Sequence, residues 1–190
     1  MKKTLFLIIA ISMLSLSFWG CSDDSLNNPI STDNFESLQK NPNNLPSIVE
    51  IAASDTNFSY LVAAVQFANL DDVLNSNRQF TVFAPVNQAF LDLAADLNIT
   101  IQELLTEPYR ELVTAVLLYH VSPGQKKSIN VIKSGKVNTL LKQFAFTRIE
   151  NGSAQIGNDT NGYANIVGVD IRASNGIVHV LDKVIVPVLQ

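Results

Sequence analysis

Cysteine is nearly absent from this sequence, which has 190 residues and a single cysteine at position 21. One thiol cannot form an intrachain disulfide, so the class of small domains held together by disulfides is excluded. The stability of the folded part must come from buried apolar side chains. The stretch from Leu45 to the end of the chain is long enough for one domain of ordinary size.

Catalytic and metal-binding motifs are also missing. The sequence has no G-x-S-x-G, H-E-x-x-H or G-x-G-x-x-G motif, and no serine is marked as a nucleophile. His120 and His179 occur in separate motifs, without cysteine or carboxylate at metal-ligand spacing. The segment 158–162 faintly resembles a calcium loop but lacks the later bidentate glutamate, so we interpret it as a polar hairpin turn. We predict no enzyme activity, no metal site and no cofactor.

Positive charge is scarce, with 13 Lys and Arg against 17 Asp and Glu. Removal of Lys2 and Lys3 with an N-terminal leader leaves 11 basic residues (13 minus 2), and a formal charge of −6. The basic residues are scattered, and no basic run is longer than Lys126-Lys127. This pattern excludes nucleic acid as an expected partner.

The first 20 residues are typical of a secretory signal peptide. Lys2 and Lys3 precede an uncharged run, residues 4–20, that is rich in Leu, Ile and Phe but interrupted by serines. This run is short for a membrane-spanning helix. It ends at Gly20-Cys21, which resembles the lipobox of bacterial lipoproteins, although Phe18 and Trp19 depart from the usual pattern. We therefore expect cleavage before Cys21 and lipid attachment to it, which would hold the chain to a membrane through acyl chains.

Residues 21–44 form the predicted tether between this anchor and the domain. The segment is rich in Ser, Asn, Asp and Pro and has few large apolar side chains, so it cannot repay the entropy of ordering. Ser22-Asp23-Asp24 resembles signals that send lipoproteins to the cell exterior in some Gram-negative bacteria. Simple solvation of a linker explains the same cluster equally well. We expect anchoring to the cell envelope, with the outer membrane as the favoured site, and the sequence leaves exposure at the cell surface and exposure to the periplasm both open.

The domain, residues 45–190, has helical periodicity in its first half. Apolar stripes predict helices at 46–53 and after Asp55, a short helix capped near Asp71, and a helix capped by Asn87. A further helix begins after Thr106, carries Leu112, Val113, Val116 and Leu117, and is stopped by Pro123-Gly124. The compact apolar run from Phe80 to Ala84 predicts a buried strand.

The second half of the domain has the pattern of strands. Segments 144–149, 163–171 and 177–186 are rich in β-branched and aromatic residues. Asn151-Gly152 and Asn175-Gly176 separate strands, and Asn-Gly favours the type I′ hairpin turn, in which both central residues have positive φ. Helices followed by hairpins predict an α+β fold, with the helical half packed on a β-rich half.

Three segments in this order resemble the signature of the fasciclin (FAS1) family: Phe80 to Phe90, Leu118-Tyr119-His120-Val121, and Ser174 to Pro187. They resemble, in turn, the strand-to-helix motif, the central Tyr-His motif and the C-terminal hairpin motif. The resemblance covers about residues 45–187 and implies the fasciclin fold. One departure is Val86, where the family commonly has threonine.

The resemblance implies a surface-presented adhesion or binding module that recognises extracellular protein or polysaccharide. Tyr119 and His120 are its candidate binding residues, because this region is associated with integrin binding in animal members. The residues themselves favour a fold role for His120, which is on the apolar face of its helix, and place Tyr119 nearer the edge. His179 shares a strand face with apolar residues and is interpreted as a fold residue.

Two other functions remain open. One is an accessory lipoprotein that binds a small apolar or lipid ligand in a surface cleft, which a continuous apolar groove would favour. The other is a hydrolase, which requires a serine or carboxylate within hydrogen-bond reach of His120 or His179 in an open pocket. Full burial of either histidine would count against the hydrolase.

Overall fold

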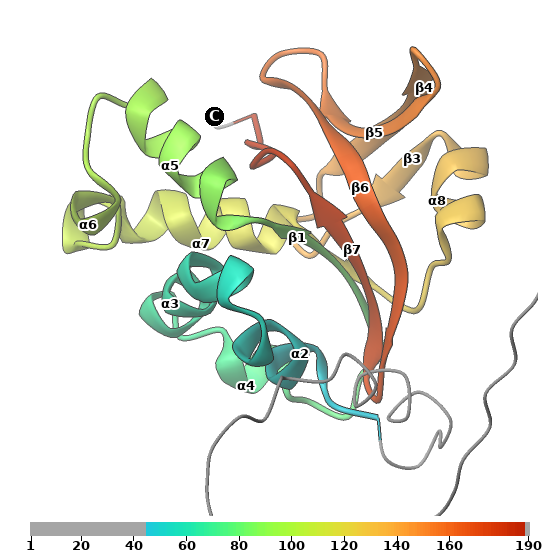
Figure 1. Ribbon diagram of the computed structural model, residues 1–190, viewed down its shortest axis with the longest axis horizontal. Coiled ribbons are helices and arrows are strands. Elements are labelled where there is room, and N and C mark those ends of the chain that lie inside the picture. Colours follow the sequence, from blue (N-terminus) through green and yellow to red (C-terminus); the bar gives the residue numbers. More distant parts are fainter. Residues whose placement is uncertain (1–44, 189–190) are drawn as a thin grey trace, which may run out of the picture. The chain divides into compact units, whose positions relative to one another are not determined.

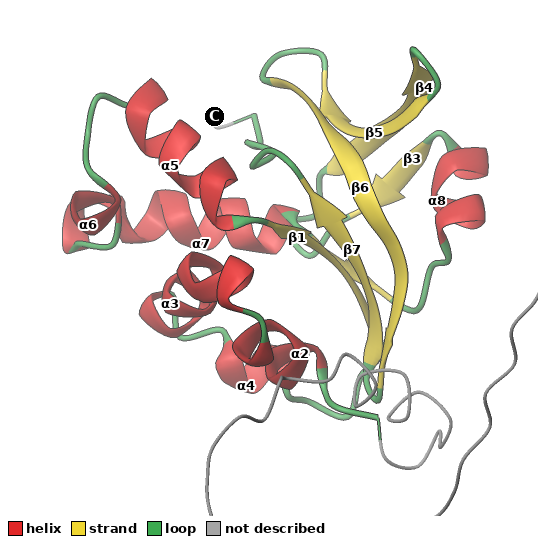
Figure 2. Cartoon of the chain, in the orientation of Figure 1, coloured by secondary structure: helices red, strands yellow, loops and turns green. Residues whose placement is uncertain are grey.

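A computed structural model describes residues 45–188 and shows an α+β fold (Figures 1 and 2). Helices dominate the first half of this part and a seven-stranded sheet the second, which confirms the predicted fold class. The predicted signal peptide 1–20, Cys21 and the rest of the tether to residue 44 lie outside the described residues. Within residues 45–188, no helix is both long enough and apolar enough to cross a membrane.

In Figure 2, all the described helices except the last lie on one side of the first strands. Their bounds are α2 (Ile48–Ser54), the 3-10 turn η1 (Thr56–Phe58), α3 (Ser59–Phe67), α4 (Asp71–Leu74), α5 (Asn87–Asp96), α6 (Ile101–Leu104), η2 (Glu107–Tyr109), α7 (Arg110–Tyr119) and α8 (Ser128–Ser134). Short helices α6 and α8 were not predicted, because four to seven residues carry too little periodicity to be recognised.

The strands form one sheet in the order β2-β1-β7-β6-β5-β4-β3. Their bounds are β1 (Phe80–Pro85), β2 (Val121–Pro123), β3 (Lys136–Asn138), β4 (Phe144–Glu150), β5 (Ser153–Asn158), β6 (Gly162–Ala173) and β7 (Gly176–Leu181). The pair β1 and β7, second and third in this order, is parallel, and the other neighbours are antiparallel. The first and third family motifs therefore meet side by side in adjacent strands of the sheet.

Two hydrophobic clusters lie on opposite sides of β1. Val82 belongs to the larger cluster with the helices, whereas its neighbour Phe83 belongs to the smaller one. Successive side chains of a strand point to opposite faces, so a strand buried on both sides has no polar alternation. The smaller cluster consists of Phe83, Tyr119, Val131, Val137, Ala145, Ile156, Ala164, Leu181 and Ile185.

Helix α7 ends earlier than predicted, at Tyr119 rather than at Pro123-Gly124. The reason is that the chain pairs with β1 immediately afterwards, with Val121 opposite Val82. The start also differs, because Pro108 lies in the separate 3-10 turn η2 that precedes α7.

Asn87 is not the N-cap of α5, contrary to the prediction. Val86 occupies that position and makes no side-chain cap hydrogen bond. The Asn87 side chain instead accepts a hydrogen bond from the Tyr60 N–H at 3.0 Å and donates to the Thr56 carbonyl at 2.8 Å. It therefore ties the start of α5 to the start of α3, a long-range role that sequence spacing does not indicate.

The two Asn-Gly pairs behave differently. Asn151 and Gly152 have φ of 51° and 80°, which confirms the predicted positive-φ turn between β4 and β5. The prediction was wrong at Asn175-Gly176, because neither residue has positive φ. Gly176 is needed there for space, since a Cβ would lie 2.1 Å from the Phe80 carbonyl oxygen. The Asn175 side chain accepts from the Ile48 N–H at 2.9 Å and so fastens α2 to this hairpin.

Candidate functional site

Tyr119 lies inside the domain and not at the edge of its helix, with 1% of its surface exposed. Its ring belongs to the smaller hydrophobic cluster. Its hydroxyl donates a hydrogen bond to the Phe144 carbonyl at 3.0 Å and accepts one from the Asn158 side-chain amide at 3.3 Å. Burial raises the pKa of Tyr119, although the Asn158 hydrogen bond opposes that shift. This side chain joins α7 to β4 and to the end of β5.

His120 is equally enclosed, with 1% of its surface exposed. Its Nδ1 is 2.7 Å from the Val116 carbonyl oxygen, which can only accept, and its Nε2 is 3.1 Å from the Ile185 backbone N–H, which can only donate. These partners require a neutral ring with the proton on Nδ1. Burial lowers the pKa of His120 to about 4. Both nitrogens are used to fasten the end of α7 to the C-terminal segment.

His179 is also buried, and both its nitrogens are used. Nδ1 accepts from the Asp170 backbone N–H at 3.2 Å, and Nε2 donates to the Lys126 carbonyl at 2.9 Å. The Asp170 carboxylate is held by the Ser128 N–H at 2.8 Å and hydroxyl at 2.7 Å. Serine, aspartate and histidine are neighbours here, but the carboxylate orients the serine rather than the imidazole, so no nucleophile–base pair exists at this position.

A hydrolase that uses His120 or His179 fails the criterion set above, since both histidines are fully buried. The segment 158–162 forms the turn between β5 and β6, and the side-chain oxygen Oδ1 of Asn158 accepts from the backbone N–H groups of Thr160 and Asn161. Across residues 45–188, no cluster of three His, Cys, Asp or Glu side chains could hold a metal ion.

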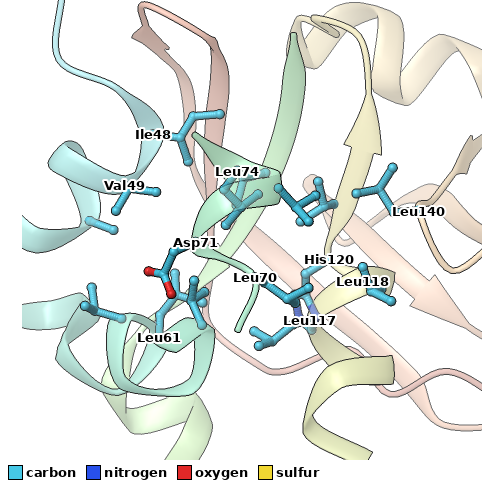
Figure 3. A pocket seen from close by; sticks show the side chains of 16 residues that line it. Ile48, Val49, Leu61, Leu70, Asp71, Leu74, Leu117, Leu118, His120 and Leu140 are labelled. Carbon is cyan, nitrogen blue, oxygen red and sulfur yellow. The ribbon is translucent and has the colours of Figure 1, made fainter. Parts of the chain in front are cut away.

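An apolar pocket opens between α2, α4 and the end of α7 (Figure 3). Its cavity volume is about 40 Å³. The lining is aliphatic except for Asp71 and the ring of His120: Ile48, Val49, Ala52, Leu61, Val62, Val65, Leu70, Asp71, Val73, Leu74, Val82, Leu117, Leu118, His120, Val121 and Leu140. Such a pocket is the kind of cleft that favours a small apolar ligand.

A wider hollow of about 230 Å³ lies between α5 and the C-terminal segment. Its lining is mixed, with Asp96 and Lys183 among leucines and valines. The nearby Asn161 amide is already used, because it donates to the Val186 and Pro187 carbonyls at 3.1 and 2.9 Å. This hollow therefore offers fewer directed contacts to a ligand than its volume suggests.

The outer sheet face is the third candidate, and we define it as Lys136, Phe144, Phe146, Arg148, Gln155, Tyr163 and Asn165. The register brings these residues together, since Phe146 is opposite Gly157 and Gly157 is opposite Tyr163. Residues between them on the strands, such as Ala145 and Ile156, point into the smaller cluster. Phe144 and Phe146 remain 47% and 44% exposed.

Cations and amides are interleaved with these rings. The Arg148 guanidinium lies 3.8 Å from the centre of the Tyr163 ring, and the Lys136 ammonium lies 4.7 Å from that of Phe144. Arg148 also donates to the side-chain oxygen Oε1 of Gln155 at 2.9 Å, and the Gln155 side-chain amide donates to Oδ1 of Asn165 at 2.9 Å. The result is a preorganised surface whose polar groups satisfy one another and whose aromatic rings face solvent.

Neither the apolar pocket nor the outer sheet face was identified from the sequence. The alternation of large Phe144 and Phe146 with small Ala145 and Thr147 is a usable signal for a two-faced strand. It does not say which face is buried. The pocket has no comparable signal, because its lining residues read as ordinary core positions.

Comparison with known proteins places residues 56–187 in agreement with the family model described as the fasciclin domain. Protein sll1483 of Synechocystis sp. is 38% identical over 141 residues, which are 74% of this chain and 73% of that protein. Immunogenic protein MPB70 of Mycobacterium bovis is 33% identical over 174 residues, or 88% of this chain and 80% of that protein.

Longer animal proteins match over a small part of their length. Transforming growth factor-beta-induced protein ig-h3 of Oryctolagus cuniculus is 34% identical over 144 residues, which are 74% of this chain but 19% of that protein. Among solved structures, a FAS1 domain pair from the insect cell adhesion molecule Fasciclin I matches with a TM-score of 0.64 and 21% identity. That match covers 76% of this chain and 51% of the other. At this identity the structural match concerns the fold alone.

Proposed function

This chain belongs to the fasciclin domain family, and on that premise we propose that it is a lipid-anchored, extracytoplasmic binding module without enzymatic activity. It recognises extracellular protein or polysaccharide at the outer sheet face. Fasciclin domains occur in adhesion-related proteins, of which the insect cell adhesion molecule is one. The observation that carries the proposal is the exposed pair Phe144 and Phe146, set among a lysine, an arginine and amides.

Protein is the favoured partner at this face. Aromatic residues and arginine are enriched where proteins bind one another, and exposed rings supply the anchors that carry most of the binding energy. A polysaccharide can stack its sugar rings on the same aromatic side chains, but its hydroxyl groups also need free donors and acceptors. Here Arg148, Gln155 and Asn165 already bond to one another.

We expect Phe146→Ala to weaken binding to the captured partner about tenfold or more, the cost typical of an aromatic anchor. The immobilised domain, residues 45–190, would be screened against panels of matrix proteins, polysaccharides and lipids. Leu91→Ala is the matched control, because Leu91 is 38% exposed on α5, away from this face. Equal losses in the two variants, or none in either, would remove the outer sheet face from the proposal.

The anchor has a separate test at Cys21. We expect the wild-type chain, expressed in a Gram-negative host, to incorporate radiolabelled fatty acid and to fractionate with the envelope. Cys21→Ser is expected to lose the label completely, because the thiol is the attachment point. Ser22→Ala is the control and should keep the label. Incorporation of label by Cys21→Ser would contradict lipidation at this residue.

A second function, an accessory that binds a small apolar or lipid ligand, is favoured by the aliphatic pocket between α2, α4 and α7. Retention of lipid alone in the panel screen would support this function over adhesion.

A further inference from the structure

The apolar pocket holds one charged side chain. Asp71 begins α4, is half-buried, and is the single ionisable carboxylate of the lining. In Figure 3 its oxygens lie, in this view, between Val49 and Leu61. Among the described residues it forms no ion pair, since the salt bridges there join Arg110 to Glu107 and Arg148 to Glu150. A carboxylate beside apolar walls gains most from a cation brought to it.

The other polar side chain of the lining does not compete for a ligand. Both ring nitrogens of His120 are bonded to Val116 and Ile185, so the imidazole contributes only carbon surface to the pocket. Recognition of a charged ligand therefore depends on Asp71, with Asp72 exposed beside it. The acidic balance of the chain, net −4, also favours the approach of a cation.

The size of the pocket limits the apolar part of its ligand. A cavity of about 40 Å³ holds roughly three water molecules, which is the room taken by one short branched alkyl group. The inner walls, such as Leu74 and Val82, are buried, whereas Asp71 is nearer the solvent. The positive end of the ligand must therefore be at the mouth and the alkyl end inside.

We infer that this pocket binds a free short-chain aliphatic amine, with its alkyl group among Leu70, Leu74 and Leu118 and its ammonium group on Asp71. A lysine side chain of a partner has the opposite polarity, because its ammonium group would enter first. The inference rests on the second function proposed above, the binding of a small apolar ligand, and names the class of that ligand. It does not involve the outer sheet face.

The test uses three probes with the same branched chain: 3-methylbutylammonium, 3-methyl-1-butanol and 4-methylpentanoate. They would be titrated into the full chain in lipid nanodiscs, followed by methyl NMR of labelled Ile, Leu and Val. We expect saturable shifts at Val49, Leu70 and Leu74, and none at Val131 and Ile156 of the smaller cluster. The ammonium probe should bind about three- to tenfold tighter than the alcohol, the range of a partly screened ion pair, and the carboxylate more weakly than either.

Two pairs of variants separate charge from volume. Asp71→Asn should abolish the preference for ammonium and leave the alcohol affinity unchanged, whereas Asp72→Asn should retain the preference. Ala52→Leu fills the pocket and should abolish all three titrations, whereas Ala53→Leu, at an exposed position of the same helix, should not. Unchanged methyl signals of the smaller cluster will show that each variant is folded.

The inference is overturned if no probe gives saturable shifts at the pocket methyls. It is also overturned if the three probes bind alike, or if Asp71→Asn keeps the preference. Such a failure leaves the proposed adhesion function standing, because Phe144, Phe146 and Arg148 are not part of the pocket. Conversely, a failure of the panel screen does not affect the titrations.

Discussion

Tyr119→Ala is expected to lower the free energy of unfolding by about 3–5 kcal/mol, the cost of removing a fully buried aromatic ring. The ring belongs to the smaller hydrophobic cluster, which also contains residues of β1, β3, β4, β5, β6, β7 and α8. Its loss also leaves the Phe144 carbonyl and the Asn158 amide without one partner each. The measurement is urea unfolding of the domain followed by circular dichroism.

Tyr119→Phe separates the two contributions, because it keeps the ring and removes the hydroxyl. We expect it to cost about 1–3 kcal/mol, the range for leaving a buried polar group without its partner, because the hydroxyl bonds both to the Phe144 carbonyl and to the Asn158 amide. If the free energy of unfolding of Tyr119→Ala is within about 1 kcal/mol of the wild-type value, the ring does not contribute to the stability of the core as its burial indicates. If the loss is as large as expected, a loss of adhesion in Tyr119→Ala is explained by unfolding and not by a lost contact with a partner.

The burial of Tyr119 explains why sequence periodicity misplaced it. Val113, Val116 and Leu117 of α7 face the larger cluster, and the apolar pattern of the helix identifies them correctly. A periodicity argument assigns one buried side to a helix and leaves the rest to solvent. Strands β3 to β6 cover the end of α7 on a second side, so the Tyr119 ring belongs to the smaller cluster. That second contact depends on strands more than 20 residues away, such as β4 and β5.

Strong local signals predicted the elements that one stretch of chain specifies. The run from Phe80 to Ala84 is a buried strand, and Asn151-Gly152 is a positive-φ turn, as expected. Long-range contacts overrode local preference elsewhere. Asn87 and Asn175 were interpreted through their neighbours in sequence, yet each bonds to a helix far away in the chain.

The pocket and the outer sheet face arise from contacts between segments that are distant in the sequence. A leucine such as Leu70 or Leu118 has the same sequence signature whether it touches another side chain or lines a gap. The outer face depends on strand pairing, because only the register places Phe146 and Tyr163 on either side of a glycine without a side chain. Sequence patterns therefore identified the family and the core, and the fold was required to locate a surface that can bind.

Acidification from pH 7 to pH 4 is expected to lower the free energy of unfolding by about 3 kcal/mol through His120. Its pKa is about 4 in the folded domain and 6.5 in the unfolded chain. Between these values the unfolded state binds one more proton, so stability falls as pH falls, by about 1.4 kcal/mol per unit. Above pH 6.5 the histidine is neutral in both states and its contribution is complete. Below pH 4 it is protonated in both states, and the loss levels off.

His120→Gln isolates this contribution, because glutamine is neutral at every pH. The variant should be less stable than the wild type at pH 7, since one amide cannot meet both the Val116 carbonyl and the Ile185 N–H with ring geometry. Between pH 7 and pH 4, the free energy of unfolding of the variant should fall by about 3 kcal/mol less than that of the wild type. Burial also lowers the pKa of His179, which remains in both proteins and cancels in the difference. Equal pH dependence in the two proteins would mean that His120 accepts a proton without leaving its site. This result would contradict the assignment of a neutral ring that joins α7 to Ile185.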